Sequence, residues 1–150
     1  SDEFVGYGNA SSCYNQDSSP AVISINEAAP GAYMSCSNGE IYDNSDAYYL
    51  LYHPNLAWVP ANFSSIFKIS NTIRMKGGNW PFMFGRALIN DRYSLGKIHA
   101  GNGVFGFYTY TSNGEIYLST GFEVLTCNLS PPCRRFFKLF FYINLLNFLI

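Results

Sequence analysis

Large and smaller side chains alternate along short runs of this chain, as they do in half-buried β-strands. Residues 107–111 read Phe-Tyr-Thr-Tyr-Thr, and residues 122–125 read Phe-Glu-Val-Leu. Such runs recur about every ten residues with glycine or asparagine between them, which is typical of short antiparallel strands. No stretch before residue 134 has the apolar period of a helix. Further strands are expected at residues 32–36, 40–42, 48–52, 66–69, 72–75, 81–84, 97–98, 104–105 and 115–118.

One hexapeptide, Ser-Asn-Gly-Glu-Ile-Tyr, occurs identically at residues 37–42 and at residues 112–117. A weaker match at the same offset of 75 residues, with one slip, joins residues 19–26 to residues 94–102. An identity of this length at a fixed offset, inside a longer match, indicates an internal repeat.

Each copy of the hexapeptide contains Asn-Gly between two β-rich runs, the strongest short-range signal for a β-hairpin. Both central residues of a type I′ turn have positive φ, so we predict turns at Asn38-Gly39 and Asn113-Gly114. Two such repeats predict an all-β, tandem-repeat antiparallel sandwich, or a barrel-like arrangement of short strands. The expected divisions are a first, incomplete and divergent repeat at 1–56, a second repeat at 57–127, and a hydrophobic, basic tail at 128–150.

The amino-acid composition favours β-strands, and the charge distribution does not favour a nucleic-acid partner. Aromatic residues make up 18% of the 150 residues and charged residues only 13%, whereas long amphipathic helices need more Ala, Glu and Lys. Residues 1–67 hold seven acids and no Lys or Arg, while residues 68–127 hold six bases and three acids. We therefore expect the two halves to attract each other. No basic run is dense enough to predict a nucleic-acid partner.

The chain has little of the chemistry that an enzyme or a metal site needs. It has no phosphate loop, dinucleotide fingerprint or G-x-S-x-G elbow, so a catalytic triad that includes His99 has no supporting context. Four cysteines allow three pairings if oxidised, and without a C-x-x-C spacing zinc is not expected. We predict a protein that is not an enzyme, with no catalytic residue, metal site or cofactor. The cysteines are Cys13, Cys36, Cys127 and Cys133.

The tail differs in character from the repeats. Residues 134–150 join a basic cluster to an apolar part of about 15 residues, short of the roughly 20 that span a bilayer. The tail is interpreted as a truncated anchor, an interfacial segment that contacts the membrane, or non-native sequence. The chain begins with Ser1 and shows no signal peptide, which is typical of an incomplete or processed N-terminus. Localisation stays open between the cytoplasm and secretion.

A series of short motifs runs through the second half of the chain. The motifs are Trp58-Val59, Phe-Gly-Arg-Ala at 84–87, Leu-Gly-Lys-Ile at 95–98, the aromatic hairpin through Glu115, and Phe-Glu-Val-Leu at 122–125. In their order and spacing, residues 58–125 resemble one unit of the DM-nine repeat family. The first repeat is similar only through the internal match, and Val5-Gly6-Tyr7 stands in the place of the family's Gly-Arg step.

This resemblance implies an all-β tandem with a pseudo-two-fold relation between its units. It also implies mannose binding, because one branch of the family consists of mannose-binding recognition proteins of innate immunity. In that branch the sugar is held by an Asp after paired glycines and by the Lys of the Gly-Lys step. Lys97 matches this Lys, whereas Asn79 stands where the Asp is expected, and Val22 takes the Lys position in the first repeat. The second repeat therefore keeps half of such a site.

Four residues form the candidate ligand site: Lys97, Asn79, Trp80 and Glu115. Sugar hydroxyls are bound by polar groups that donate and accept hydrogen bonds, often beside an aromatic ring. The alternative interpretation is structural, with Asn79 in a turn, Trp80 in the core, Lys97 solvated and Glu115 exposed. A pocket lined by Lys97, Asn79 and a carboxylate would favour sugar binding, and Lys97 alone in solvent would oppose it.

We predict a non-catalytic, mannose-type carbohydrate-binding recognition protein whose partner is a glycan. The alternative is an interaction or structural repeat protein that has lost sugar binding. Arg86 is expected to form a structural salt bridge with Glu123 or Glu115. A homodimer, and a membrane contact through the tail, stay open as further partners.

Overall fold

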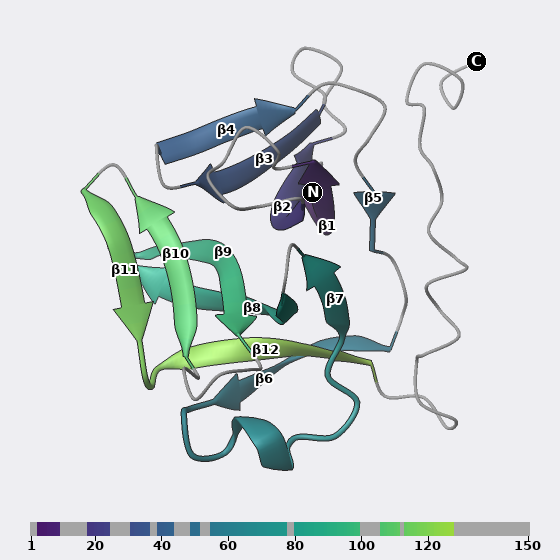
Figure 1. Cartoon of the computed structure of the whole chain (residues 1–150), viewed down its shortest axis with the longest axis vertical. Coiled ribbons are helices and arrows are strands. Elements are labelled where there is room, and N and C mark those ends of the chain that lie inside the picture. Colours follow the sequence, from purple (N-terminus) through teal and green to yellow (C-terminus); the bar gives the residue numbers. More distant parts are fainter. Residues whose placement is uncertain are drawn as a thin grey trace.

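The computed structural model describes residues 3–9, 18–24, 31–36, 39–43, 49–51, 55–77, 80–99, 106–111 and 113–127. This part of the chain is all-β, as the sequence predicts. Its strands form two antiparallel sheets, and its helical content is a single 3-10 turn. In Figure 1 the purple and blue strands of the first half lie above the teal and green strands of the second half.

The first sheet has five strands in the order β4-β3-β2-β1-β5. They are β1 (Glu3–Asn9), β2 (Ser18–Ser24), β3 (Gly31–Cys36), β4 (Gly39–Asp43) and β5 (Tyr49–Leu50). The second sheet has seven strands in the order β11-β10-β9-β8-β12-β6, with β7 beside β8. They are β6 (Leu56–Ala61), β7 (Arg74–Gly77), β8 (Trp80–Ile89), β9 (Arg92–His99), β10 (Phe107–Thr111), β11 (Gly114–Leu118) and β12 (Phe122–Cys127). The sheets meet where β2 and β3 lie against β9 and β10.

The pairing of β2, β3 and β4, the first unit, has the same register as that of β9, β10 and β11, the second unit. In the preceding strand the equivalent residues are 79 and not 75 positions apart, because Gly6 of β1 lies opposite Ala21 and Gly85 of β8 lies opposite Gly96. The sequence match at an offset of 75 residues is therefore accompanied by equivalent strand pairing. Corresponding cross-strand pairs are Val22–Tyr33 with Lys97–Tyr108, and Ser35–Glu40 with Tyr110–Glu115.

The β8–β9 hairpin is closed by Asn90 and Asp91, whose φ angles are 51° and 63°. They connect Ile89 to Arg92, which lie opposite each other, so the turn has two residues and positive φ at both of them. This is the type I′ pattern, whose twist matches that of the flanking strands. Asn and Asp tolerate the left-handed conformation better than other residues with a side chain.

The β10–β11 hairpin differs from the prediction, because its turn lies one residue earlier. Thr111 lies opposite Gly114, so Gly114 already belongs to β11. Gly114 has a φ of +107°, whereas Asn113 does not have positive φ, and the predicted type I′ turn at these two residues is wrong. The Asn113 N–H donates to the Thr111 hydroxyl at 3.2 Å, a local bond that competes with that turn. Asn38 lies outside the described residues.

Residues 66–69, which the pattern predicts as a strand, are not one: they contain the 3-10 turn η1 (Ile66–Lys68). The Asn62 side-chain oxygen accepts the N–H groups of Ser64 and Ser65, each at 2.9 Å, and so starts a turn immediately before η1. Ile66 is 1% exposed, because the turn buries it against the second sheet. The strand expected at 104–105 lies outside the described residues.

The second sheet carries a buried cluster on each face. The first cluster consists of Ala61, Ile66, Met83, Ala87, Ile98, Phe107, Phe122 and Val124. The second includes Phe82, Phe84 and Leu125, and Val5 and Tyr7 of the first sheet pack against it. Burial of one phenylalanine contributes about 1.5–3 kcal/mol. The second cluster therefore supplies the apolar contact that holds the two sheets together.

Candidate functional site

A cleft of about 180 Å³ opens where the two sheets meet, and we call it the inter-sheet cleft. Five of its lining side chains come from the second unit and two from the first. They are Lys97 and His99 of β9, Tyr108 and Tyr110 of β10, Glu115 of β11, and Ser19 and Ser35 of β2 and β3. The inter-sheet cleft therefore needs both halves of the chain.

Strand alternation explains why the five side chains of the second unit share one face. Residues two apart on a strand point to the same side, as Tyr108 and Tyr110 do. Directly opposite residues of antiparallel strands also share a face. Lys97 lies opposite Tyr108, and Glu115 lies opposite Tyr110. The pairing register alone thus gathers these groups on one surface.

Lys97 is only 9% exposed, although lysine side chains are ordinarily solvated. Its Nζ lies 4.7 Å from the ring centroid of Phe82, a cation–π distance that compensates part of the lost hydration. The preceding glycine is required here, because a Cβ on Gly96 would overlap the carbonyl oxygen of Tyr108. The Lys97 side chain therefore lines the inter-sheet cleft in a largely buried position and is not a solvated charge.

Tyr110 and Glu115 lie opposite each other in the β10–β11 pairing, and both line the inter-sheet cleft. Burial raises the pKa of Tyr110, and the negative charge of Glu115 raises it further. The pKa of Tyr108 is also raised, first by burial and then by Tyr117 and Glu115. Both hydroxyls are therefore protonated at neutral pH and are able to donate as well as accept.

His99 packs edge-on against the Tyr108 ring, with centroids 5.3 Å apart. Burial lowers the pKa of His99, the positive charge of Lys97 lowers it further, and Glu115 acts in the opposite direction. The imidazole is therefore neutral at neutral pH, with one nitrogen that donates and one that accepts.

Ser35 connects the inter-sheet cleft to the interior of the second unit. Its hydroxyl oxygen lies 3.3 Å from the Thr109 hydroxyl, which is 1% exposed. Thr109 donates its single hydrogen to the Leu95 carbonyl at 2.9 Å, so in the Ser35 contact it acts as the acceptor. This polar contact between β3 and β10 helps to set the distance between the sheets on this side.

The four residues of the predicted site have different outcomes. Lys97 and Glu115 line the same cleft. Asn79 lies outside the described residues, and Trp80 begins β8 opposite Gly77 but its side chain is not described. The sequence did not predict the other five lining residues, which are Ser19, Ser35, His99, Tyr108 and Tyr110. The alternation of β9 and β10 was a signal for the last three, whereas no local pattern pointed to the serines.

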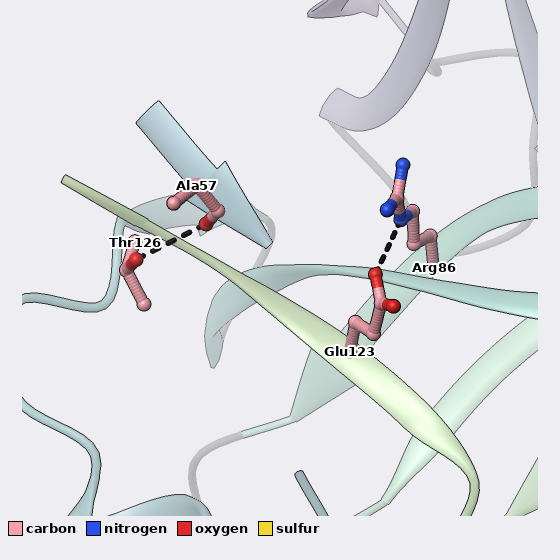
Figure 2. A network of polar contacts seen from close by, with 4 residues as sticks. All are labelled: Ala57, Arg86, Glu123 and Thr126. Atoms are coloured by element: carbon pink, nitrogen blue, oxygen red, sulfur yellow. Dashed lines mark hydrogen bonds and ion pairs between the residues drawn. The ribbon is translucent and has the colours of Figure 1, made fainter. Parts of the chain in front are cut away.

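Arg86 forms the predicted structural salt bridge with Glu123, from Nε to a carboxylate oxygen at 2.6 Å. Figure 2 shows this pair beside a second polar contact on β12, in which the Thr126 hydroxyl donates to the Ala57 carbonyl at 3.0 Å. Glu123 lies opposite Arg86 in the β8–β12 pairing, so the salt bridge is a cross-strand contact. The pair does not line the inter-sheet cleft.

Other features of the described residues bear on the predicted partners and cysteines. Cys127 is disulfide-bonded and 1% exposed. In the described part of the chain, no group of three or more His, Cys, Asp or Glu side chains is placed to hold a metal ion. No helix among the described residues is long and apolar enough to cross a membrane.

The chain matches no protein-family model, no curated protein and no solved structure. The similarity to the DM-nine family therefore stays a prediction from the sequence motifs.

Proposed function

We propose that this chain is a non-catalytic recognition module that binds one residue of a mannose-type glycan in the inter-sheet cleft. The observation that carries the proposal is that Lys97 and the Glu115 carboxylate line one cleft together. A lysine isolated in solvent would have argued against sugar binding, and Lys97 is largely buried instead.

The hydrogen-bonding groups of the inter-sheet cleft are complementary to a polyol. Each sugar hydroxyl donates one hydrogen bond and accepts others, so it is best bound by a mixture of donors and acceptors. Lys97 offers donors, Glu115 offers acceptors, and His99 and the tyrosine hydroxyls offer both. The Tyr108 ring adds an apolar surface of the kind that pairs with the C–H groups of a sugar.

The size and the charges of the inter-sheet cleft favour binding without catalysis. Its volume of about 180 Å³ is below the roughly 300 Å³ of the smallest pockets for drug-sized ligands, which suits a single monosaccharide. Glycoside hydrolysis requires two carboxyl groups on either side of the bond. Among the described residues, Glu115 is the one carboxylate that lines the inter-sheet cleft, so this acid–base pair is not formed by them.

The test is a titration of ¹⁵N-labelled protein with methyl α-D-mannopyranoside. We expect saturable shifts of the backbone amides of His99 and Tyr108, with a Kd of about 1 mM, which corresponds to roughly −4 kcal/mol. Lys97→Met keeps the length of the side chain but removes its donors, and it should weaken binding at least about tenfold. Lys68→Met is the matched control, because Lys68 is exposed and does not line the cleft. Absence of saturable shifts in folded protein, and of any signal on a glycan array, would overturn the proposal.

A second candidate is a structural repeat protein that has lost sugar binding. It is favoured by the position of the Lys97 ammonium over the Phe82 ring, which gives this lysine a packing role of its own. In that case Lys97→Met would change the free energy of unfolding, while no glycan would bind to either the variant or the original chain. Glycan binding and the free energy of unfolding, measured for the original chain and for Lys97→Met, therefore distinguish the two candidates.

A further inference from the structure

A second, larger cleft of about 400 Å³ lies on the second sheet, around the Arg86–Glu123 salt bridge. We call it the arginine cleft. It shares no lining residue with the inter-sheet cleft. Its polar and aromatic lining includes Asn62, Arg86, Tyr93, Thr120 and Glu123.

Arg86 is held in place from three sides. Its guanidinium carbon lies 4.7 Å from the ring centroid of Trp58 and 4.1 Å from that of Tyr93. Its Nε is bonded to Glu123 at 2.6 Å, which leaves the terminal nitrogens outside this bond. In Figure 2 the outermost nitrogen of Arg86 points away from Glu123. The side chains of Arg86 and Glu123 each retain 26% exposure, so a ligand in the arginine cleft can reach both.

The remaining polar groups of the arginine cleft are also oriented or accessible. The Asn62 side-chain oxygen accepts from the backbone N–H groups of Ser64 and Ser65, so the amide is oriented and its NH₂ group serves as a donor. The Thr120 hydroxyl is exposed on the rim. Tyr93 is 57% exposed, an unusual position for a large aromatic ring that is stacked on a cation.

We propose that the arginine cleft is a second ligand site, which takes a neutral sugar residue. Its charges cancel, because Glu123 neutralises Arg86, and the Glu123 carboxylate would repel an acidic ligand. Preorganised donors and acceptors beside an accessible aromatic ring are the groups that recognise a polyol. An apolar peptide would leave these polar groups without partners at a cost in free energy.

This inference does not depend on the function proposed for the inter-sheet cleft, because the two clefts have separate residues. The test is a titration of ¹⁵N-labelled protein with methyl α-D-mannopyranoside, methyl β-D-galactopyranoside and methyl β-D-glucopyranoside, followed at the Arg86 Nε–H and the Tyr93 amide. We expect saturable shifts of both signals with at least one of the three. Tyr93→Ala should abolish them and leave the shifts at His99 and Tyr108 intact. Lys97→Met should have the opposite effect.

The control variant is Arg92→Ala, which removes an exposed side chain next to Tyr93 that does not line the arginine cleft. It should leave the shifts unchanged. Circular dichroism and thermal unfolding test whether each variant is folded. We expect Tyr93→Ala to fold, because Tyr93 is mostly exposed. No saturable shift at Arg86 with any neutral glycoside would overturn the inference. Shifts that appear only with glucuronate would also overturn it, because the ligand would then be acidic. If the Arg86 and Tyr93 signals shift but the His99 and Tyr108 amides do not, the function proposed for the inter-sheet cleft would be overturned instead.

Discussion

The first and second units share a strand register but present different chemistry to the inter-sheet cleft. The second unit contributes a lysine, a histidine, two tyrosines and a glutamate, whereas the first contributes two serines. The corresponding positions are Lys97 and Val22, His99 and Ser24, and Tyr110 and Ser35. Register depends on backbone hydrogen bonds and on the buried face of each strand. The other face is free to vary, so equivalent hairpins carry unequal sites.

The largest expected effect on the free energy of unfolding concerns Gly96, whose equivalent in the first unit is Ala21. A methyl group on Gly96 would overlap the Tyr108 carbonyl, whereas the Ala21 methyl is fully buried without such an overlap. Gly96→Ala should lower the free energy of unfolding by about 3 kcal/mol. Ala21→Gly, the matched control, should lower it by about 1.5 kcal/mol through backbone entropy and lost burial. Urea denaturation measures both, and equal losses would show that the units are not distinguished at this position.

A smaller effect concerns Tyr110, which lies opposite Glu115 and has Ser35 as its equivalent in the first unit. Tyr110→Phe removes the hydroxyl on the Glu115 side of the inter-sheet cleft and should cost about 1 kcal/mol of folding stability. Because the variant also loses a group that donates and accepts hydrogen bonds in the inter-sheet cleft, affinity for methyl α-D-mannopyranoside should fall several-fold. The control is Tyr117→Phe, on an exposed side chain outside the inter-sheet cleft. If both variants bind equally well, the Tyr110–Glu115 pair does not distinguish the second unit.

The smallest expected effect is a pH dependence of the free energy of unfolding. It is specific to the second unit, because Ser24 takes the place of His99 in the first unit. In the folded chain the pKa of His99 is lowered, mainly by burial and then by Lys97. The unfolded chain therefore takes up the proton first, near the ordinary histidine pKa of about 6.5. Stability should fall as the pH drops from about 6.5 to the folded pKa of His99, with no further loss from this group below it.

The measurement is the free energy of unfolding as a function of pH for the original chain and for His99→Gln. Other groups titrate in both proteins, so their difference isolates His99. A difference that is independent of pH between 7 and 5, values on either side of the histidine range, would contradict the assignment.

Much of the fold followed from local signals. The all-β class, most strands and the Arg86–Glu123 salt bridge agree with the alternation and the residue types in the sequence. The errors arose where a side chain bonds to a nearby backbone group. The Asn62 oxygen turns the chain before η1, and the Thr111 hydroxyl binds the Asn113 N–H in the β10–β11 hairpin. Such bonds override the average preference of a pattern, because they satisfy the backbone in another way.

The candidate site was predictable only in part. Lys97 and Glu115 were reached through a family resemblance, and strand alternation places His99, Tyr108 and Tyr110 on the same face as them. Ser19 and Ser35 required knowledge of how the two sheets meet.

By itself, the sequence determined the strand class and the offset of 75 residues, because the alternation of side chains and the repeated hexapeptide are local features of the chain. Only the tertiary structure decided that Lys97 is buried over Phe82 and that serines of the first unit complete the cleft. The physical reason is that burial of the shared apolar cluster sets how the sheets pack. The polar residues beside that cluster are brought together as a consequence, and no local pattern of the chain records it.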